Sequence, residues 1–590
     1  EDNMDKRMYT MKDKDIFNRL LAYAKPFIKD FALVVLLMLF TVALAIAEPI
    51  LIGRAIDLIK TGTFAYTDLF VYLGVMVGII LIGSVFNYLQ TVMLQIIGQS
   101  IVYNIREEIF AHLENHDIAY LNGTPTGALV TRVTNDTNTL NEMYTSVIVS
   151  VIKNVMMVVA IIIAMFVLNT RLTLYVIMTL PFIVFFSFIF RRYSRKIYRE
   201  VRGNISKVNA FLAEHLSGMK IIQIFNQEQR KFEEFEVRNK KLKYSYYKQI
   251  FVFGIYRPSM YLIYMSAVMI VFYIGGTQVI GGAITIGVLF TFYMFVGRFF
   301  EPIQELAEQF NVLQSAFASS ERIFGILDSK RKVLDDPNAI ELDDIKGEIE
   351  FKDVWFKYVE DEWVLKGVSF HVKAMDSVAF VGSTGSGKTT ILALITRNYD
   401  IQKGEILIDG INIKKIKAAS LRKFVGQMLQ DVFMFSGTIE SNIKLKNDEI
   451  TKEEMIEACE YVNADKFIDK LDNGYLEEVR ERGNNFSSGQ RQLVSFARTI
   501  VHKPKVMILD EATSNIDTET EQLIQESLTK MMSIGTMLIV AHRLSTIQHV
   551  DNIIVLSKGR ILEQGNHQEL LKQKGHYYNL YKLQYEERKV

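Results

Sequence analysis

Residues 382–389 read GSTGSGKT, and this combination of glycines, a lysine and a threonine has the spacing of a phosphate-binding loop. The apolar run VAFV precedes it and the helical pattern ILALI follows it, so the G-x-x-x-x-G-K-[ST] pattern occurs in its required strand–loop–helix context. Backbone N–H groups in such a loop close around phosphate oxygens, and the helix N-terminus adds positive dipole. Lys388 is placed to reach β- and γ-phosphates, and the Thr389 hydroxyl to hold Mg²⁺.

Two further apolar runs end in polar side chains that suit the same chemistry. In KVMILDE, a buried strand brings Asp510 to its carboxyl end, where doubly wound sheets bind ligands. We expect Asp510 to contact Mg²⁺ through water, and Glu511 to orient and deprotonate attacking water. In MLIVAHRL, the strand ends near His542, a candidate γ-phosphate contact. A solvated acidic turn and a structural histidine are the alternatives, and the neighbouring phosphate loop argues against both.

The elements that must carry these residues fall into two halves. Apolar residues make up 49% of the 590, and long runs such as FALVVLLMLFTVALAIA lie between residues 27 and 320, whereas β-like and helical patterns alternate beyond residue 349. A helix needs about 20 mostly apolar residues to cross a bilayer. We therefore expect an all-α membrane half with six crossings followed by an α/β P-loop half, with crossings near residues 30–52, 69–92, 150–168, 172–191, 252–274 and 284–303.

Charge gives the orientation of these crossings and excludes some function classes. Lys and Arg number fifteen in residues 191–250 and seven in residues 1–29, but only Arg171 lies in the connection 169–171 and none in 275–284. The positive-inside rule places both termini, the long connections and the C-terminal half in the cytoplasm. A net charge of +1 gives no basic field for nucleic acid. The single cysteine, Cys459, excludes a disulfide framework.

The long cytoplasmic connections are expected to be helical. Between Asp68 and Asp117 there is no proline, and a continuous helix there would be about 75 Å long, so it must project into the cytoplasm. NGTPTG at 122–127 predicts a turn at its tip, and IIQIFNQEQRKFEEF surrounds a second tip. The tips are either solvated or contact the C-terminal half. The N-terminal DIFNRLLAYAK is either an amphipathic surface helix or an extension of the first crossing.

Together these motifs resemble the ATP-binding cassette (ABC) transporters, and nearly the whole chain resembles a half-transporter exporter of that family. The resemblance implies domains at 1–325 (membrane), 326–346 (linker) and 347–590 (nucleotide binding). It implies catalysis by Glu511, His542 and Lys388, with Mg²⁺ held by Thr389, Gln430 and Asp510. It also implies that Tyr358 stacks on adenine, that Asp517 lies in the loop after the catalytic acid, and that ATP contacts Tyr358, Gly382, Ser383, Thr384, Gly385, Ser386, Gly387, Lys388, Thr389, Thr390 and Gln430.

The segment FSSGQ, residues 486–490, departs from the family pattern Leu-Ser-Gly-Gly-Gln. In the family, these signature residues (here Ser487, Ser488, Gly489 and Gln490) contact ATP held by the partner subunit, so two chains are required. Ser488 replaces a glycine whose lack of Cβ permits close approach. Because the other catalytic residues match the active pattern, we expect a heterodimer in which Ser488 serves a second, slow site. A homodimer that tolerates serine is the alternative.

The sequence indicates the transported compound less clearly than the nucleotide site. Polar residues at membrane depth suggest function. The alternative for Glu48, Arg257, Arg298 and Glu301, which we favour, is that they sit near the membrane edges or pair with one another. Met- and aromatic-rich spans either line an adaptable apolar cavity or serve ordinary helix packing and lipid contact. The leading expectation is an exporter of small hydrophobic or amphipathic drugs, and the Lys-, Ile- and Asn-rich composition suggests a bacterial cytoplasmic membrane. A lipid flippase, a peptide exporter or an ATP-gated channel or regulator are the alternatives. Six crossings exclude a soluble cassette protein.

Overall fold

The computed structural model describes residues 11–61, 66–360, 362–510, 518–540 and 547–587. The chain forms two compact units. The first comprises Glu1–Asn115 and Thr126–Ser329, and the second comprises His116–Pro125 and Lys330–Val590. The boundaries expected from the sequence at 325 and 347 stay predictions.

The first unit is helical, as predicted. Within the described residues, six of its segments are long and apolar enough to cross a membrane. The expected long helix is confirmed as α3, which would be about 74 Å long at 1.5 Å per residue. Its helices are α1 (Asp13–Ala24), α2 (Ile28–Thr61), α3 (Tyr66–Glu114), α5 (Thr126–Thr131), α6 (Thr137–Glu142), α7 (Ile148–Leu168), α8 (Thr170–Ile177), α9 (Leu180–Ser217), α10 (Met219–Ile224), α11 (Glu228–Ile280) and α12 (Ile286–Leu327).

The fourth crossing, expected near 172–191, contains a break between two helices. α8 ends at Ile177 and α9 begins at Leu180, with Pro181 in the first turn of α9. Proline has no N–H to donate to the preceding turn, so it is tolerated at a helix start but interrupts a helix interior. The crossing therefore consists of two consecutive helices.

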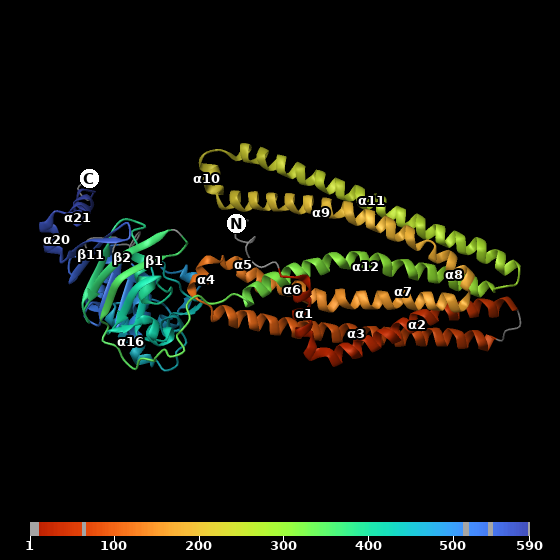
Figure 1. Ribbon diagram of the computed structural model, residues 1–590, viewed down its shortest axis with the longest axis horizontal. Coiled ribbons are helices and arrows are strands. Elements are labelled where there is room, and N and C mark those ends of the chain that lie inside the picture. Colours follow the sequence, from red (N-terminus) through yellow and green to blue (C-terminus); the bar gives the residue numbers. More distant parts are fainter. Residues whose placement is uncertain (1–10, 62–65, 361, 511–517, 541–546, 588–590) are drawn as a thin grey trace. The chain divides into compact units, whose positions relative to one another are not determined.

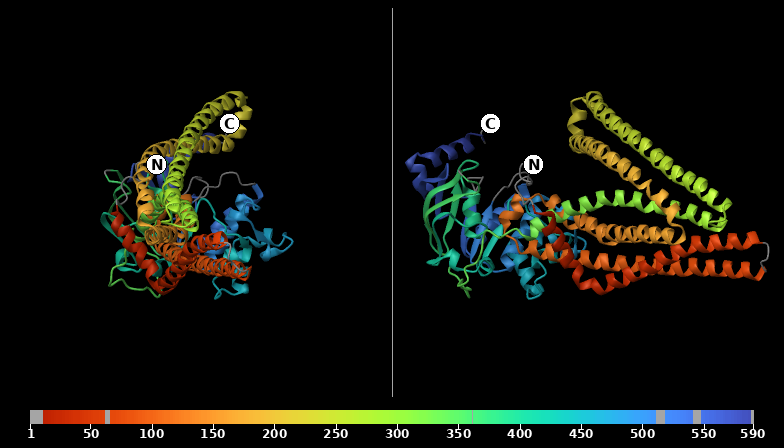
Figure 2. Two further views of the ribbon diagram at one scale, coloured as in Figure 1. Left: turned by 90° about the vertical axis from the view of Figure 1, so that its right-hand side faces the viewer. Right: turned by 45° about the vertical axis from the view of Figure 1, so that its right-hand side comes forward.

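Packing in the first unit is concentrated along α7, α8, α11 and α12. Large apolar side chains there, including Ile161, Leu172, Phe292, Phe295 and Phe299, are almost completely buried. α9 and α11 run side by side as a long pair joined at α10 (Figures 1 and 2). The most apolar window of α3, by contrast, buries none of its residues within the chain. Such faces suit contact with lipid or with another subunit.

The second unit is α/β, as predicted. Its sheets have strand orders β2-β1-β4-β5, β12-β11-β3-β10-β9-β6 and β7-β8. The strands are β1 (Ile349–Lys357), β2 (Trp363–Val372), β3 (Ser377–Val381), β4 (Lys403–Ile408), β5 (Ile411–Asn412), β6 (Val425–Met428), β7 (Gly437–Thr438), β8 (Glu478–Val479), β9 (Val506–Asp510), β10 (Thr536–Val540), β11 (Asn552–Ser557) and β12 (Arg560–Gly565). The helices are α4 (Ile118–Gly123), α13 (Lys388–Ile395), α14 (Ala418–Lys423), α15 (Ile439–Lys444), α16 (Lys452–Tyr461), α17 (Asp465–Ile468), α18 (Ser488–Val501), α19 (Thr518–Met531), α20 (His567–Gln573) and α21 (His576–Glu587).

The six-stranded sheet is covered on both faces, which explains why its strands are continuous apolar runs. Successive side chains of a strand point to opposite faces. Val378, Phe380 and Ile508 accordingly pack against the four-stranded antiparallel sheet. Ala379 and Leu509 pack against a second core that includes α16, α18 and α19. The strands β3, β9 and β10 are thereby fixed between two cores, and the loops at their ends have a rigid base.

Candidate nucleotide site and transport unit

Parallel pairing brings the predicted phosphate-handling residues to one edge of the six-stranded sheet. β10 pairs in parallel with β3 and β9, aligning Val540 with Phe380 and Asp510, and β6 pairs in parallel with β9. The loop after β3 carries the glycine motif, Asp510 ends β9, and Gln430 follows β6 by two residues. These three candidates therefore lie at the carboxyl ends of neighbouring strands, where doubly wound sheets bind ligands.

The glycine loop has the close contacts that its sequence requires. Gly387, which caps α13, has φ of 104°, and a Cβ there would lie 2.6 Å from Leu365 Cδ2. Gly385 has φ of 80°, and nothing lies within 4 Å of where its Cβ would be. Glycine is thus needed at both positions, at one because of the conformation and the packing, and at the other because of the conformation alone. The open side at Gly385 leaves room for a ligand to approach the backbone.

Lys388 lies across this loop. Its Nζ donates to the carbonyl oxygens of Gly382 at 2.7 Å and Ser383 at 3.1 Å. Burial lowers the pKa of Lys388, and the Asp510 carboxylate opposes that shift. The amine is therefore held over the mouth of the loop, and phosphate oxygens are the acceptors that would replace the two carbonyls.

Polar groups around the loop fit a magnesium-bound triphosphate. The hydroxyl of Ser386 is buried and has no hydrogen-bond partner in the described part of the chain. The side chain of Thr389 is exposed at the first turn of α13, and Ser383 and Thr384 are exposed beside it. A buried, unpaired hydroxyl needs a partner. A phosphate oxygen or a metal-bound water would supply one, so the donor set suits phosphate with Mg²⁺.

Tyr358, the expected adenine contact, follows β1. Its hydroxyl lies 3.1 Å from Thr390 Oγ1 on α13, and its ring meets the ring of Tyr399 edge to face, with centroids 5.0 Å apart. The side chain is still 48% exposed. Tyr358 is thus fixed at its hydroxyl and along one side, while a large part of the ring remains open for stacking.

Tyr399 also contacts the tip of the first long connection. The sequence is compatible with either a solvated or a docked tip. Residues 116–125, including α4, belong to the same compact unit as the nucleotide-site candidates. Asn122 Nδ2 donates to the Tyr399 hydroxyl at 3.3 Å. Asp117 caps α4 by accepting from the backbone N–H of Tyr120, and it accepts from Lys332 and Val333 as well. The tip is therefore docked and is two aromatic rings away from the loop helix α13.

Tyr399 and Asp117 were not among the residues singled out from the sequence. Both lie in stretches, RNYD and ENHD, that carry no recognisable motif. An aspartate directly before the segment IAYLNG could have indicated a helix cap. Nothing in the sequence indicated the contacts with Lys332 or Asn122, because each joins segments more than 200 residues apart.

The signature residues begin α18 and do not directly follow a strand of the six-stranded sheet. Ser487 is the N-cap, and it forms a capping box with Gln490, in which each side chain accepts from the backbone N–H of the other residue. Ser488 is the first residue of the helix and is half-buried. Helical backbone does not require glycine. The effect of a serine here is therefore confined to its side chain.

Three predicted residues lie outside the described residues: Glu511, Asp517 and His542. Along the chain, Glu511 directly follows Asp510, and His542 comes two residues after β10. The strands that lead to two of them are described, but their side chains are not.

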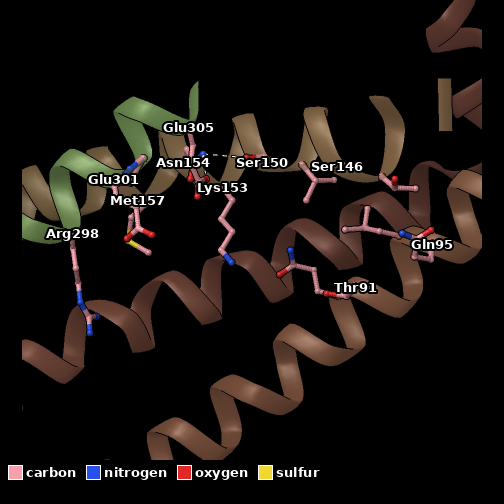
Figure 3. Close-up of a pocket in the computed structure, with 15 residues that line it drawn as sticks. Thr91, Gln95, Ser146, Ser150, Lys153, Asn154, Met157, Arg298, Glu301 and Glu305 are labelled. Atoms are coloured by element: carbon pink, nitrogen blue, oxygen red, sulfur yellow. Dashed lines mark hydrogen bonds between the residues drawn. The ribbon is translucent and has the colours of Figure 1, made fainter. Parts of the chain in front are cut away.

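The first unit holds the residues expected at membrane depth. Arg298 forms an ion pair with Glu48 at 2.5 Å and also donates to the Ala45 carbonyl, so pairing explains these two charges. Glu301 lines a cavity of about 580 Å³ between α3, α7 and α12 (Figure 3). Arg257 is exposed on α11 and does not line that cavity.

An α/β unit with a glycine loop and an acidic strand end, joined to six candidate crossings, defines an ATP-binding cassette attached to a membrane-spanning unit. The chain belongs to the ABC transporter family. The family model for the ABC transporter transmembrane region matches residues 31–303, and the model for the ABC transporter matches residues 365–514.

Relatives and solved structures extend the match over nearly the whole chain. The uncharacterized ABC transporter ATP-binding protein YknV of Bacillus subtilis is 39% identical over 96% of this chain and 94% of the relative. A probable multidrug resistance ABC transporter protein of the same organism, YheH, is 37% identical over 86% and 76%. An ATP-dependent lipid A-core flippase of Syntrophus aciditrophicus is 33% identical over 98% and 96%. The structure of a bacterial Atm1-family ABC exporter with ATP bound superposes with a TM-score of 0.78 at 28% identity, covering 94% of this chain and 98% of that one.

The protein is accordingly a half-transporter of the exporter type. It is an ATPase coupled to transport, it uses ATP with Mg²⁺, and it dimerises in a lipid bilayer as a multi-pass inner-membrane protein.

Proposed function

We propose that the chain is the catalytically competent subunit of a heterodimeric exporter that moves small amphipathic compounds out of the cytoplasm or the inner leaflet. The observation that carries the cargo class is the cavity of the membrane unit, whose walls combine charged and amide side chains with Leu94, Val149 and Met157. A purely apolar cargo would leave those polar groups unpaired, whereas an amphipathic one would satisfy them.

The nucleotide site is proposed to work with this chain's own loop and strand ends. Lys388 and the loop residues bind the phosphates, Thr389, Gln430 and Asp510 hold Mg²⁺, and Tyr358 stacks on adenine. Glu511 orients and deprotonates the attacking water, and His542 contacts the γ-phosphate. Ser487, Ser488, Gly489 and Gln490 face the ATP of the partner subunit. Support comes from the convergence of β3, β6 and β9 on one edge, whereas the signature residues begin a helix, α18, and follow none of these strands.

A second chain is also supported by the tip at α10. Ile221, Ile224 and Phe225 are 63%, 64% and 68% exposed there. Three large apolar side chains on one short segment in the cytoplasm mark a protein contact. We propose that this tip docks on the nucleotide unit of the partner.

Coexpression with the product of a neighbouring half-transporter reading frame tests the proposal. We expect a stable heterodimer that transports an amphipathic dye into inside-out vesicles on addition of ATP. This chain expressed alone should give little ATPase activity. Normal turnover from this chain alone would refute the heterodimer, and ATP hydrolysis by the complex without uphill transport would favour a channel or regulator.

A lipid flippase is the second candidate, since relatives at similar identity carry both names, multidrug resistance and lipid A-core flippase. Stimulation of ATPase activity by phospholipids, compared with stimulation by hydrophobic cations, distinguishes the two.

A further inference from the structure

The membrane-unit cavity is lined by three helices that are distant in sequence, and by Thr145 and Ser146 just before α7. α3 contributes Gln90, Thr91 and Gln95, α7 contributes Lys153 and Asn154, and α12 contributes Arg298, Glu301 and Glu305. Figure 3 shows the Lys153 side chain extending from α7 toward α3. With a volume of about 580 Å³, the cavity is large enough for a polar head group.

Besides Arg298, the cavity is lined by a second cationic side chain, Lys153. It lies on α7, as the fourth residue of the crossing expected at 150–168 and so near the cytoplasmic end of that apolar span. Arg298 is neutralised by Glu48 at 2.5 Å. For Lys153 the described residues offer no hydrogen bond or ion pair. A lysine within an apolar span is costly and marks a ligand or ion path.

Gln90 and Glu301 carry hydrogen-bond acceptors of this cavity that have no donor in the described part of the chain. Gln90 is 4% exposed, and its Oε1 has no partner among the described residues although the residue lines the cavity. Glu305 accepts from Asn154 Nδ2 at 2.9 Å, so its charge is partly compensated. Glu301 has no such contact in the described part of the chain. The cavity thus presents one unmatched ammonium group together with acceptors that need a donor.

We propose that this cavity binds the head group of an amphipath in which a phosphate, or another anionic group, lies next to a hydrogen-bond donor such as an ammonium group. Lys153 binds the anion, Gln90 and Glu301 accept from the donor, and the apolar chain lies along the exposed lipid-facing helices. This rests on the proposed export function and names the head group that the transport cavity selects, which favours the lipid candidate over hydrophobic cations. It adds Lys153 and Gln90 as specificity-determining residues.

Equilibrium binding to the assembled transporter in detergent tests the proposal without ATP turnover. The probe is radiolabelled lysophosphatidylethanolamine, compared with dodecyltrimethylammonium, which has a cationic head only. We expect Lys153→Met to weaken binding of the phosphate probe at least tenfold and that of the cation less than twofold. Lys153→Arg should restore binding to within about threefold, since it keeps the charge. Lys207→Met, which removes an exposed lysine of α9 outside the cavity, serves as the matched control.

A charge-reversal variant gives the more decisive test. Lys153→Glu should reduce binding of the phosphate probe and increase binding of dodecyltrimethylammonium, a reversal that general damage to the fold would not give. Equal losses for both probes, or no loss in Lys153→Met, would show that the cavity is only a water-filled vestibule. Glycerophosphoethanolamine, which has the head group without the chain, distinguishes the sources of the anion. Binding as tight as that of the lyso-lipid would overturn the assignment to amphipaths. Failure of transport with binding intact would count against the proposed export and leave this site standing.

Discussion

At the scale of single residues, some side chains of the nucleotide site have a hydrogen-bond partner within the chain, and one does not. Lys388 is held by two loop carbonyls, and Thr390 is held by Tyr358. Ser386, by contrast, is buried with an unpaired hydroxyl in the described structure. Such a site is preorganised. Phosphate oxygens would replace the loop carbonyls as hydrogen-bond acceptors, and the backbone would need little rearrangement.

The proposed general base gives the residue-scale prediction. Glu511→Gln keeps the size and the hydrogen-bonding ability of the side chain but removes the group that accepts a proton. We expect ATP turnover at the site that contains Glu511 to fall by about 10²- to 10⁴-fold, with ATP binding retained. Single-turnover hydrolysis and nucleotide binding, measured on the assembled transporter, check this. Near-normal hydrolysis at that site would remove Glu511 from the catalytic role.

At the scale of elements, the first cytoplasmic tip is fixed to the nucleotide unit by Asp117. Its carboxylate accepts N–H groups of Tyr120, Lys332 and Val333, so one side chain ties α4 to the chain that follows the last crossing. Burial alone would raise the pKa of Asp117, but these hydrogen bonds outweigh burial, and the pKa is lowered. The ionised form is therefore the one that the fold stabilises.

The sign of this shift predicts how stability depends on pH. A lowered pKa in the folded state means that the contribution of Asp117 is complete above its unfolded pKa of about 3.9 and is lost as pH falls through the folded value. Asp117→Asn should destabilise the unit by about 1–2 kcal/mol at pH 6, and the difference from the wild type should shrink below pH 4. Thermal unfolding followed by fluorescence measures this in the second unit, because both tryptophans, Trp355 and Trp363, lie there.

Asp343→Asn is the matched control, since Asp343 is an exposed aspartate of the same unit. A destabilisation by Asp117→Asn that stayed constant from pH 3 to pH 6 would mean that the ionised carboxylate is not the stabilising form.

At the scale of the whole molecule, two chains are required, and we propose that Ser488 makes the two ATP sites inequivalent. Its position at the first turn of α18 means that serine is compatible with the local backbone. The added side chain would instead crowd a phosphate approaching the helix N-terminus, where backbone N–H groups and the helix dipole favour anions. A chain with serine here can fold normally and still form one slow site.

The corresponding prediction uses a background in which the first site is blocked. In a heterodimer carrying Glu511→Gln, the remaining ATP turnover comes from the site that faces Ser488. Adding Ser488→Gly should change this residual rate several-fold. In the otherwise wild-type transporter, Ser488→Gly should shift the balance between the sites without stopping hydrolysis. An unchanged residual rate would mean that Ser488 does not face nucleotide.

The sequence by itself determined the class of protein and most of the nucleotide-site candidates. The loop 382–389, the strand end at Asp510 and the six apolar spans are recognised by periodicity and spacing within one segment, which the sequence shows directly. The order of β3, β10, β9 and β6 cannot be recognised in this way, because parallel pairing joins strands that are distant along the chain.

Only the tertiary structure decided the contacts between distant segments. The ion pair of Glu48 with Arg298 joins residues 250 positions apart, and the bond of Asn122 with Tyr399 joins residues 277 apart. The cavity around Lys153 is likewise assembled from α3, α7 and α12. In the sequence Lys153 is one lysine within an apolar run. Its significance depends on which side chains from other helices surround it, and packing decides that whereas local pattern does not.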